Sequence, residues 1–157
     1  MRRPSGKGLL ATVAAASGLA LARWRPFRAE VDGDSMSPAL EAGQFVVAIR
    51  PRKLRRGDVV VVRLPGFPEM VKRVVGLPGE RVEVHGGRVQ VGNRLLHEPH
   101  VSGAGPDAFW HLGDGEFAVL GDNRARSTDS TSFGPLPMSA IAGVVVLRYW
   151  PRAGLVR

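Results

Sequence analysis

The chain has 157 residues, a length that suits one domain with a buried core and at most a small appendage. Hydrophobic residues make up 44% and charged residues 23%, which excludes a disordered composition, and the lack of cysteine excludes disulfides, thiolate metal sites and a cysteine nucleophile. The net charge of +8 favours polyanionic partners, either nucleic acid or anionic lipid headgroups.

Residues 1–28 are predicted to form a basic and apolar segment ahead of the main domain, 29–157. Its centre, 9–22, runs for fourteen residues without a charge, as in a signal peptide or a short membrane anchor. A bilayer-spanning helix needs about 20 apolar residues, so we expect a short apolar helix that is marginal as an anchor. Trp24 and Phe27 lie between arginines, as at a membrane interface. A surface-lying helix, a cytosolic tail or a frayed terminus is the alternative, and the orientation stays open.

Ser35 lies in a glycine-containing turn at the start of the predicted domain. Gly33 lets backbone approach closely, and Pro38 stiffens the chain that follows. Taken alone, a serine in this setting is more typical of a turn or a helix cap than of a nucleophile.

Short valine-rich runs separated by Gly and Pro predict a mainly β domain. The seven candidate strands are 44–50, 58–64, 70–75, 81–85, 88–91, 116–120 and 141–150. Gly86-Gly87 sits between alternating residues and predicts a hairpin over 82–91. With the loop or small lobe expected at 92–115, this hairpin forms a predicted lobe over 82–115.

The candidate strand 70–75 carries two adjacent cations. Side chains alternate faces along a strand, so Lys72 shares a face with Met70 and Val74, and Arg73 points to the other face. A buried arginine stays charged and needs an anionic partner, whereas a desolvated lysine can lose its proton. Lys72 is therefore a candidate neutral base, the alternative being an edge strand whose lysine points to water.

Three further polar clusters have structural interpretations of their own. The loop 121–130 follows a candidate strand directly and, taken alone, fits an Asx-rich turn. The basic run 50–56 could contact phosphates, but its flanking turn residues and lack of aromatics favour an exposed loop. The histidines lack metal-site spacing and are interpreted as solvated loop residues rather than ligands. They are His85, His97, His100 and His111.

Taken together, these segments resemble the type I signal peptidases, Ser/Lys membrane proteases that cut leader peptides from exported proteins. The similarity spans about 31–150 and rests on motifs in the family's order. They are Asp34-Ser35-Met36-Ser37-Pro38-Ala39-Leu40, Arg56-Gly57-Asp58-Val59-Val60, Lys72-Arg73-Val74-Val75-Gly76-Leu77-Pro78-Gly79-Glu80, Gly121-Asp122-Asn123-Arg124, Ser127-Thr128-Asp129-Ser130 and Phe133-Gly134. The resemblance implies an antiparallel β-sheet or partial barrel as the core.

The resemblance also implies roles for individual residues. Ser35 would be the nucleophile, with its backbone N–H in the oxyanion hole, and Lys72 would be the general base. Ser127 would hydrogen-bond the lysine amine, and Asp129 would brace that loop. The substrate pocket for a small residue would be closed by Met36, Leu40 and Met70.

Three positions depart from the family pattern. Gly33 stands where some members carry a serine hydroxyl that assists the oxyanion hole, and Ala125 replaces a common acidic residue. Thr131 stands where an arginine usually pairs with the aspartate, so we expect a less rigid Asp129, with Arg124 or Arg126 as a substitute partner.

The expected function is cleavage of signal-peptide-bearing preproteins after small residues, by a monomer that needs no metal or cofactor and binds no nucleic acid. An extended substrate would add to strand edges near 29–33 and 69–72. Anionic membrane lipids are expected partners, with the catalytic domain on the extracytoplasmic face. The tip 64–68 and the ring of Trp150 would lie together at the lipid, or else pack as ordinary surface residues.

Other functions fit less of the chain. A cytosolic, narrow-specificity maturation protease that trims the N-terminus of one partner would share the same residues. A self-cleaving regulator would require a helix-turn-helix pattern ahead of Asp32, which the sequence lacks. A basic β-module that binds nucleic acid would leave the motifs unexplained.

Overall fold

The computed structural model describes residues 26–156. The apolar helix predicted over 9–22 lies outside these residues. Among the residues described, no helix has the length and apolar character that crossing a membrane requires.

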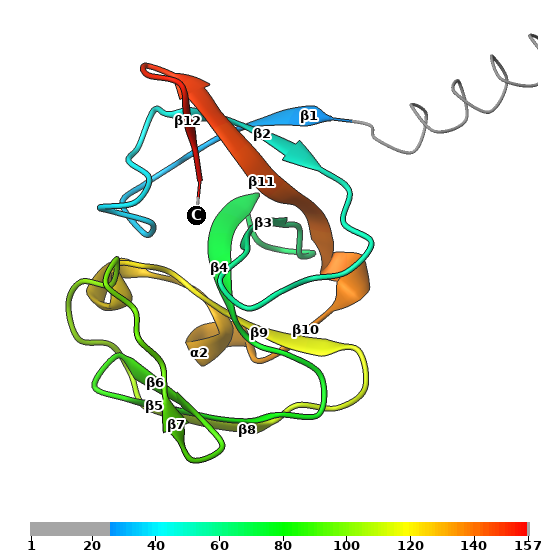
Figure 1. Ribbon diagram of the computed structural model, residues 1–157, viewed down its shortest axis with the longest axis vertical. Coiled ribbons are helices and arrows are strands. Elements are labelled where there is room, and N and C mark those ends of the chain that lie inside the picture. The colour runs from blue at the N-terminus through cyan, green and yellow to red at the C-terminus, as the bar shows by residue number, and fades with distance from the viewer. Residues whose placement is uncertain (1–25, 157) are drawn as a thin grey trace, which may run out of the picture.

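Eight of the twelve strands in the described residues form one curled antiparallel sheet, which confirms the mainly β prediction (Figure 1). Its strands lie in the order β1-β2-β11-β3-β4-β9-β10, and β12 pairs with β11. They are β1 (Phe27–Glu30), β2 (Phe45–Ile49), β3 (Val59–Val62), β4 (Met70–Gly76), β9 (Glu116–Leu120), β10 (Leu136–Pro137), β11 (Ile141–Trp150) and β12 (Gly154–Leu155). All the strands predicted in this part of the chain are present to within two residues.

β4 lies inside the sheet, between β3 and β9. Every residue of β3 and of β4 is buried, as expected for valine-rich strands that are covered on both faces. The alternative of an edge strand with Lys72 in water is therefore wrong. Both cations of β4 enter the protein interior, one on each face.

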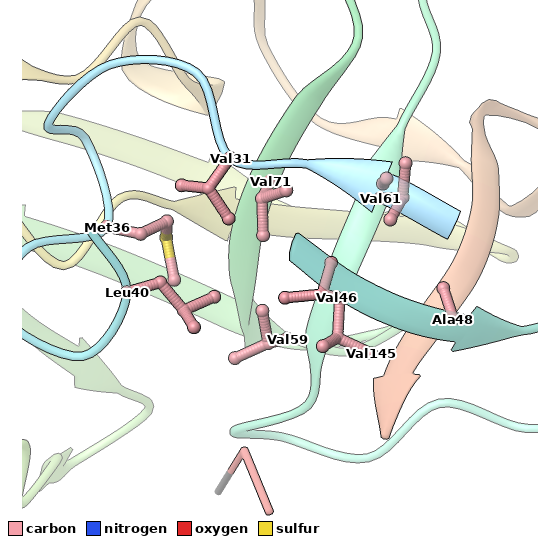
Figure 2. Packing of buried hydrophobic residues seen from close by; sticks show 10 residues of the cluster. Val31, Met36, Leu40, Val46, Ala48, Val59, Val61, Val71 and Val145 are labelled. Carbon is pink, nitrogen blue, oxygen red and sulfur yellow. The ribbon is translucent and has the colours of Figure 1, made fainter. Parts of the chain in front are cut away.

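The two faces of β4 belong to two apolar clusters. Val71 lies in the first cluster, with Met36, Leu40 and valines of β2, β3 and β11 (Figure 2). Met70 and Val74 lie in the second cluster, with Val60, Val62 and Phe117 among others. Because side chains alternate along β4, Lys72 lies on the same face as Met70 and Val74, beside the second cluster.

A separate four-stranded sheet forms the lobe below the main sheet in Figure 1. Its order is β7-β6-β5-β8, and the predicted hairpin at Gly86-Gly87 connects β5 to β6. The strands are β5 (Arg81–His85), β6 (Arg88–Val91), β7 (Arg94–Leu95) and β8 (Ala108–His111). β8 lies in a stretch predicted as loop or lobe. It was not predicted as a strand because it contains partly exposed aromatic residues and lacks the aliphatic run that indicates one.

A third apolar cluster joins the lobe to the main sheet. Val82 and Leu112 of the lobe pack with Val75 of β4 and Leu120 of β9. Gly76 makes the contact close, since a Cβ there would lie 2.7 Å from the Leu112 side chain. The lobe is therefore fixed directly beside the strands that carry Lys72 and the 121–130 loop.

The structure corrects one expectation about the surface. β11 pairs Ile141 with Val62 at one end and Trp150 with Phe45 at the other. The tip 64–68 follows β3 at the first end, so Trp150 lies at the opposite end of the sheet. Phe67 instead packs edge-on against Phe133.

Candidate active site

Lys72 and Ser35, which are separated by 37 positions in the sequence, meet in the interior. The Lys72 Nζ lies 2.7 Å from the Ser35 Oγ. β4 supplies the lysine, and the loop between β1 and β2 supplies the serine. This contact places a serine hydroxyl beside an amine.

Lys72 is only 3% exposed, opposite Val60 of β3 and between Met70 and Val74 on its own face. Burial among apolar side chains penalises the charged amine and lowers the pKa of Lys72 to about 8. The charges of Asp129 and Asp122 act in the opposite direction and limit this decrease. The amine is therefore uncharged in an appreciable fraction of molecules near neutral pH.

The backbone around Ser35 is held by the loop that follows β9. The Asn123 N–H donates to the Ser35 carbonyl oxygen at 3.0 Å. Gly121 lies so close that a Cβ at this position would be 2.5 Å from the same oxygen. Only glycine fits there, because the atom in its way is backbone rather than a movable side chain. The Ser35 N–H donates no hydrogen bond to another described residue.

Ser127 lies next to this contact but does not make the predicted hydrogen bond to Lys72. Its Oγ is buried beside Gly121 and has no hydrogen-bond partner in the described part of the chain. The Lys72 amine makes its hydrogen bond to Ser35 instead. A role for Ser127 in directing the lysine therefore stays a proposal.

Asp129 is buried and accepts three hydrogen bonds from neutral donors. The Gly121 N–H donates to one carboxylate oxygen at 3.0 Å, and the Thr131 N–H and hydroxyl donate to the other at 3.0 and 2.8 Å. Asp129 thus caps the short helix α2 (Ser130–Phe133) and holds Gly121 in place.

The expectation that an arginine substitutes as the partner of Asp129 is wrong, while the lower rigidity of Asp129 stays a prediction. Arg124 bonds to Glu98 and to backbone oxygens of Gly121 and Gly87, and Arg126 lies 3.7 Å from Asp34. Thr131 itself, the residue in the arginine's place, supplies the missing contacts.

Arg73 finds the anionic partner that its burial requires in Asp122. The guanidinium donates to both carboxylate oxygens at 2.8 and 2.7 Å, with both side chains almost fully buried. It also donates to the Gly57 carbonyl oxygen at 2.9 Å. The pair ties β4 to the 121–130 loop. This role of Asp122 was not predicted from the sequence, where its position in that loop was the available signal.

His100 is not the solvated loop residue that was expected. It is partly buried, its Nε2 lies 3.7 Å from Asp122, and burial with the nearby Arg73 charge lowers its pKa. His85 is exposed, as expected, and contacts Glu83. The described residues contain no group of His, Asp and Glu arranged to hold a metal ion.

The three predicted pocket residues are not brought together. Met36 and Leu40 lie in the first apolar cluster, close to Val31 and Val71 in Figure 2. Met70 lies in the second cluster, because it points to the opposite face of β4 from Val71. The pocket assignment therefore stays a prediction.

Comparisons with known proteins agree with this architecture. Residues 5–150 match the family model described as "Signal peptidase, peptidase S26". The chain is 36% identical to a "Signal peptidase I" of Leptolyngbya laminosa, over 81% of this chain and 71% of that protein. It is 32% identical to a "Signal peptidase IB" of Staphylococcus aureus strain COL, over 77% of this chain and 76% of that one.

A solved structure is similar as well. The crystal structure of a signal peptidase I from Enterococcus faecalis V583 superposes with a TM-score of 0.53 at 29% identity. The alignment covers 59% of this chain and 97% of that one.

The curled antiparallel sheet and these relatives together define a serine peptidase, which is a hydrolase. More particularly, the chain belongs to the signal peptidase family, peptidase S26.

Proposed function

We propose that this protein is an endopeptidase that removes signal peptides from exported preproteins, with Ser35 as nucleophile and Lys72 as general base. The observation that carries the proposal is the 2.7 Å contact between the Ser35 hydroxyl and a buried amine. A serine hydroxyl is a poor nucleophile unless an adjacent base removes its proton. An amine with a pKa of about 8 can accept that proton near neutral pH.

The reaction follows from these groups. The Ser35 Oγ attacks the scissile carbonyl carbon while its proton moves to the Lys72 Nζ. The Ser35 N–H faces the developing oxyanion, as in other acyl-transfer sites. Lys72 then protonates the leaving amine, which leaves an ester on Ser35. A water molecule that gives its proton to Lys72 then attacks the ester carbon. The bond from this carbon to the Ser35 Oγ breaks, Lys72 returns the proton to that oxygen, and the new carboxyl terminus is released.

Free sheet edges support binding of an extended substrate. β9 pairs with β4 only from Arg73 onward, so the backbone of 70–72 has a strand partner on the β3 side alone among the described residues. β1 pairs with β2 and stands at the end of the sheet order. Val31, just after β1, and Val71 of β4 lie side by side in Figure 2. A peptide strand between these edges would lie directly beside the Ser35 loop.

We also propose that the enzyme is associated with a membrane, with its catalytic domain on the extracytoplasmic face. The basic and apolar residues of 1–28 support the association with a membrane, although they do not select the face. The side chain of Phe67, which is 42% exposed at the end of the sheet where β1 begins, supports it as well.

The catalytic assignment is tested with the purified full chain in neutral detergent and a leader peptide as substrate. Ser35→Ala and Lys72→Ala should each abolish cleavage, while the exposed residues Ser139 and Lys53 provide matched controls as Ser139→Ala and Lys53→Ala. Mass spectrometry of the products should place the cut after a small residue. Full activity in both the Ser35→Ala and Lys72→Ala variants would refute the dyad.

A further inference from the structure

The loop between β2 and β3 forms a groove lined by positively charged side chains that have no acidic partner among the described residues. Its volume is about 550 Å³, and its rim carries the side chains of Arg50, Arg52, Lys53 and Arg55. These four side chains are exposed, and none of them is within ion-pairing distance of a carboxylate of the described chain. We refer to this feature as the basic groove.

The interior of the basic groove differs from its rim. Ile49, Pro51 and Val144 line it with apolar surface, and Asp58 is its one acidic residue. The Asp58 carboxylate accepts the backbone N–H of Arg55 at 2.7 Å and so braces the loop. A ligand that fits these surfaces has an anionic group for the rim and an apolar part for the floor.

The position of the basic groove indicates which ligand this is. Arg50 extends β2 toward the end of the sheet at which β1 begins, since Phe27 pairs with Ala48. The segment 1–28 therefore joins the domain beside the groove. The exposed Phe67 follows β3 at the same end, and the Arg63 guanidinium there lies 5.1 Å from the centre of the Phe27 ring. Cations, an exposed aromatic ring and the start of the domain thus share one end of the molecule.

We propose that the basic groove binds the headgroup of an anionic phospholipid. The cationic rim pairs with the phosphate, and the apolar floor takes the adjoining part of the acyl chains. Nucleic acid fits the groove less well, because no aromatic side chain lines it for base stacking. The inference deepens the membrane association proposed above, and it is independent of the Ser35 and Lys72 assignment.

The test compares the full-length wild type with two variants, each of which loses three positive charges. The groove variant carries Arg50→Gln, Arg52→Gln and Lys53→Gln. The control variant carries Arg88→Gln, Arg94→Gln and Arg152→Gln, which are also exposed. Flotation with vesicles measures the affinity for phosphatidylcholine alone and for phosphatidylcholine with about one-third phosphatidylglycerol. The ratio of the two affinities removes the contribution of the apolar segment that all forms share.

The wild type should prefer the anionic vesicles, and the groove variant should lose about tenfold or more of that preference. The control variant should keep it to within about threefold, because its cations act only through the long-range field. Equal losses in both variants, or no preference in the wild type, would overturn the proposal. Binding of the groove to a DNA duplex in preference to anionic vesicles would overturn it too.

Leader-peptide cleavage by the three forms in neutral detergent separates the two proposals. Cleavage should be the same in all forms, because the substituted residues lie outside the catalytic contacts. Loss of cleavage in every form would count against the peptidase proposal, while the vesicle ratio would still report on the groove.

Discussion

In the proposed mechanism Lys72 must be both buried and reactive, and these two conditions are connected by its pKa. At the ordinary pKa of about 10.4, only about one lysine amine in two thousand is neutral at pH 7. Burial on β4 lowers the pKa to about 8, which raises the neutral fraction by orders of magnitude. The carboxylate of Asp129 opposes this change and holds the pKa above the value that burial alone would give.

The pH dependence of cleavage should therefore report the titration of Lys72. Because the neutral amine is the proposed base, kcat/KM should rise about tenfold per pH unit below pH 8 and level off above it. Asp129→Asn should move the midpoint to lower pH, since it removes a charge that favours the protonated amine. A profile that is flat from about two pH units below the pKa of Lys72 to about one unit above it would contradict the role of Lys72 as the base.

Lys72 should also lower the stability of the fold near neutral pH. Its pKa is about 8 in the folded state and 10.5 in the unfolded chain, so the unfolded state binds the proton more tightly between these values. At 1.36 kcal/mol per unit, burial of the charged amine costs about 3 kcal/mol below pH 8.

Lys72→Met should consequently stabilise the protein by up to about 3 kcal/mol at pH 7. The advantage should shrink as the pH rises through 8 toward 10.5, because the wild-type amine is then neutral in the folded state. Urea unfolding of both proteins across this range measures the difference. A constant difference at all pH values would show that packing, not the charge, is responsible.

Thr131 should act through Asp129. In Thr131→Val the hydroxyl that donates to the Asp129 carboxylate is lost, while the backbone N–H remains. We expect a loss of about 1 kcal/mol in unfolding free energy and a fall in kcat at nearly unchanged KM. Thr131→Ser retains the donor and should restore both values, whereas an unaffected kcat in Thr131→Val would separate this hydroxyl from catalysis.

Among the elements, the position of β4 depends on the buried ion pair between Arg73 and Asp122. Arg73 and Asp122 join β4 to the loop after β9 through two short hydrogen bonds inside the protein. A buried ion pair adds little compared with apolar residues of similar size, but removal of one partner leaves a charge stranded.

Asp122→Ala should thus destabilise the protein by about 3–5 kcal/mol. The double variant Arg73→Met with Asp122→Leu should recover most of this loss, because no buried charge is left unpaired. Urea unfolding of the single and double variants measures both effects. If the single variant were as stable as the wild type, Arg73 would have to find another anionic partner.

The elements predictable from sequence were those with a local signal. The valine-rich strands have alternating or continuous apolar runs between turn residues, and all are present. β1, β7, β10 and β12 have at most four residues each, and their sequences contain no run long enough to predict a strand. They are strands because a neighbour already in the sheet offers a free edge, which is a property of the assembled fold.

The site was predictable to a similar extent. Ser35, Lys72 and Asp129 were singled out from motifs, and the structure brings the first two into contact. The partners of Arg73 and Asp129 could not be predicted, because a choice among several nearby acids, arginines and hydroxyls depends on side-chain geometry. Thr131 shows this best, since its backbone and hydroxyl together do what an arginine was expected to do.

For the molecule as a whole, stability should be greatest where the three apolar clusters meet. β3 and β4 contribute residues to both faces of the main sheet, and β4 also reaches the cluster shared with the lobe. Backbone amides of the central strands open only when most of this packing is lost.

Hydrogen exchange should reflect this order. Amides of β3 and β4 should exchange most slowly, at rates set by global unfolding, and those of β7 and β12 fastest. Mass spectrometry of peptides from the exchanged full chain measures the rates. Protection of β12 equal to that of β4 would mean that the whole sheet opens as one unit.

The antiparallel pairing of β3 with β4 has a further consequence for the chemistry. It pairs Val60 with Lys72 and Val59 with Arg73. Were the hairpin to slip by one residue, every side chain of β4 would exchange faces. A guanidinium, which keeps its proton at any physiological pH, would then point at Ser35, the proposed nucleophile, and could not accept its proton. The register of β3 against β4 therefore decides whether a lysine or an arginine faces Ser35.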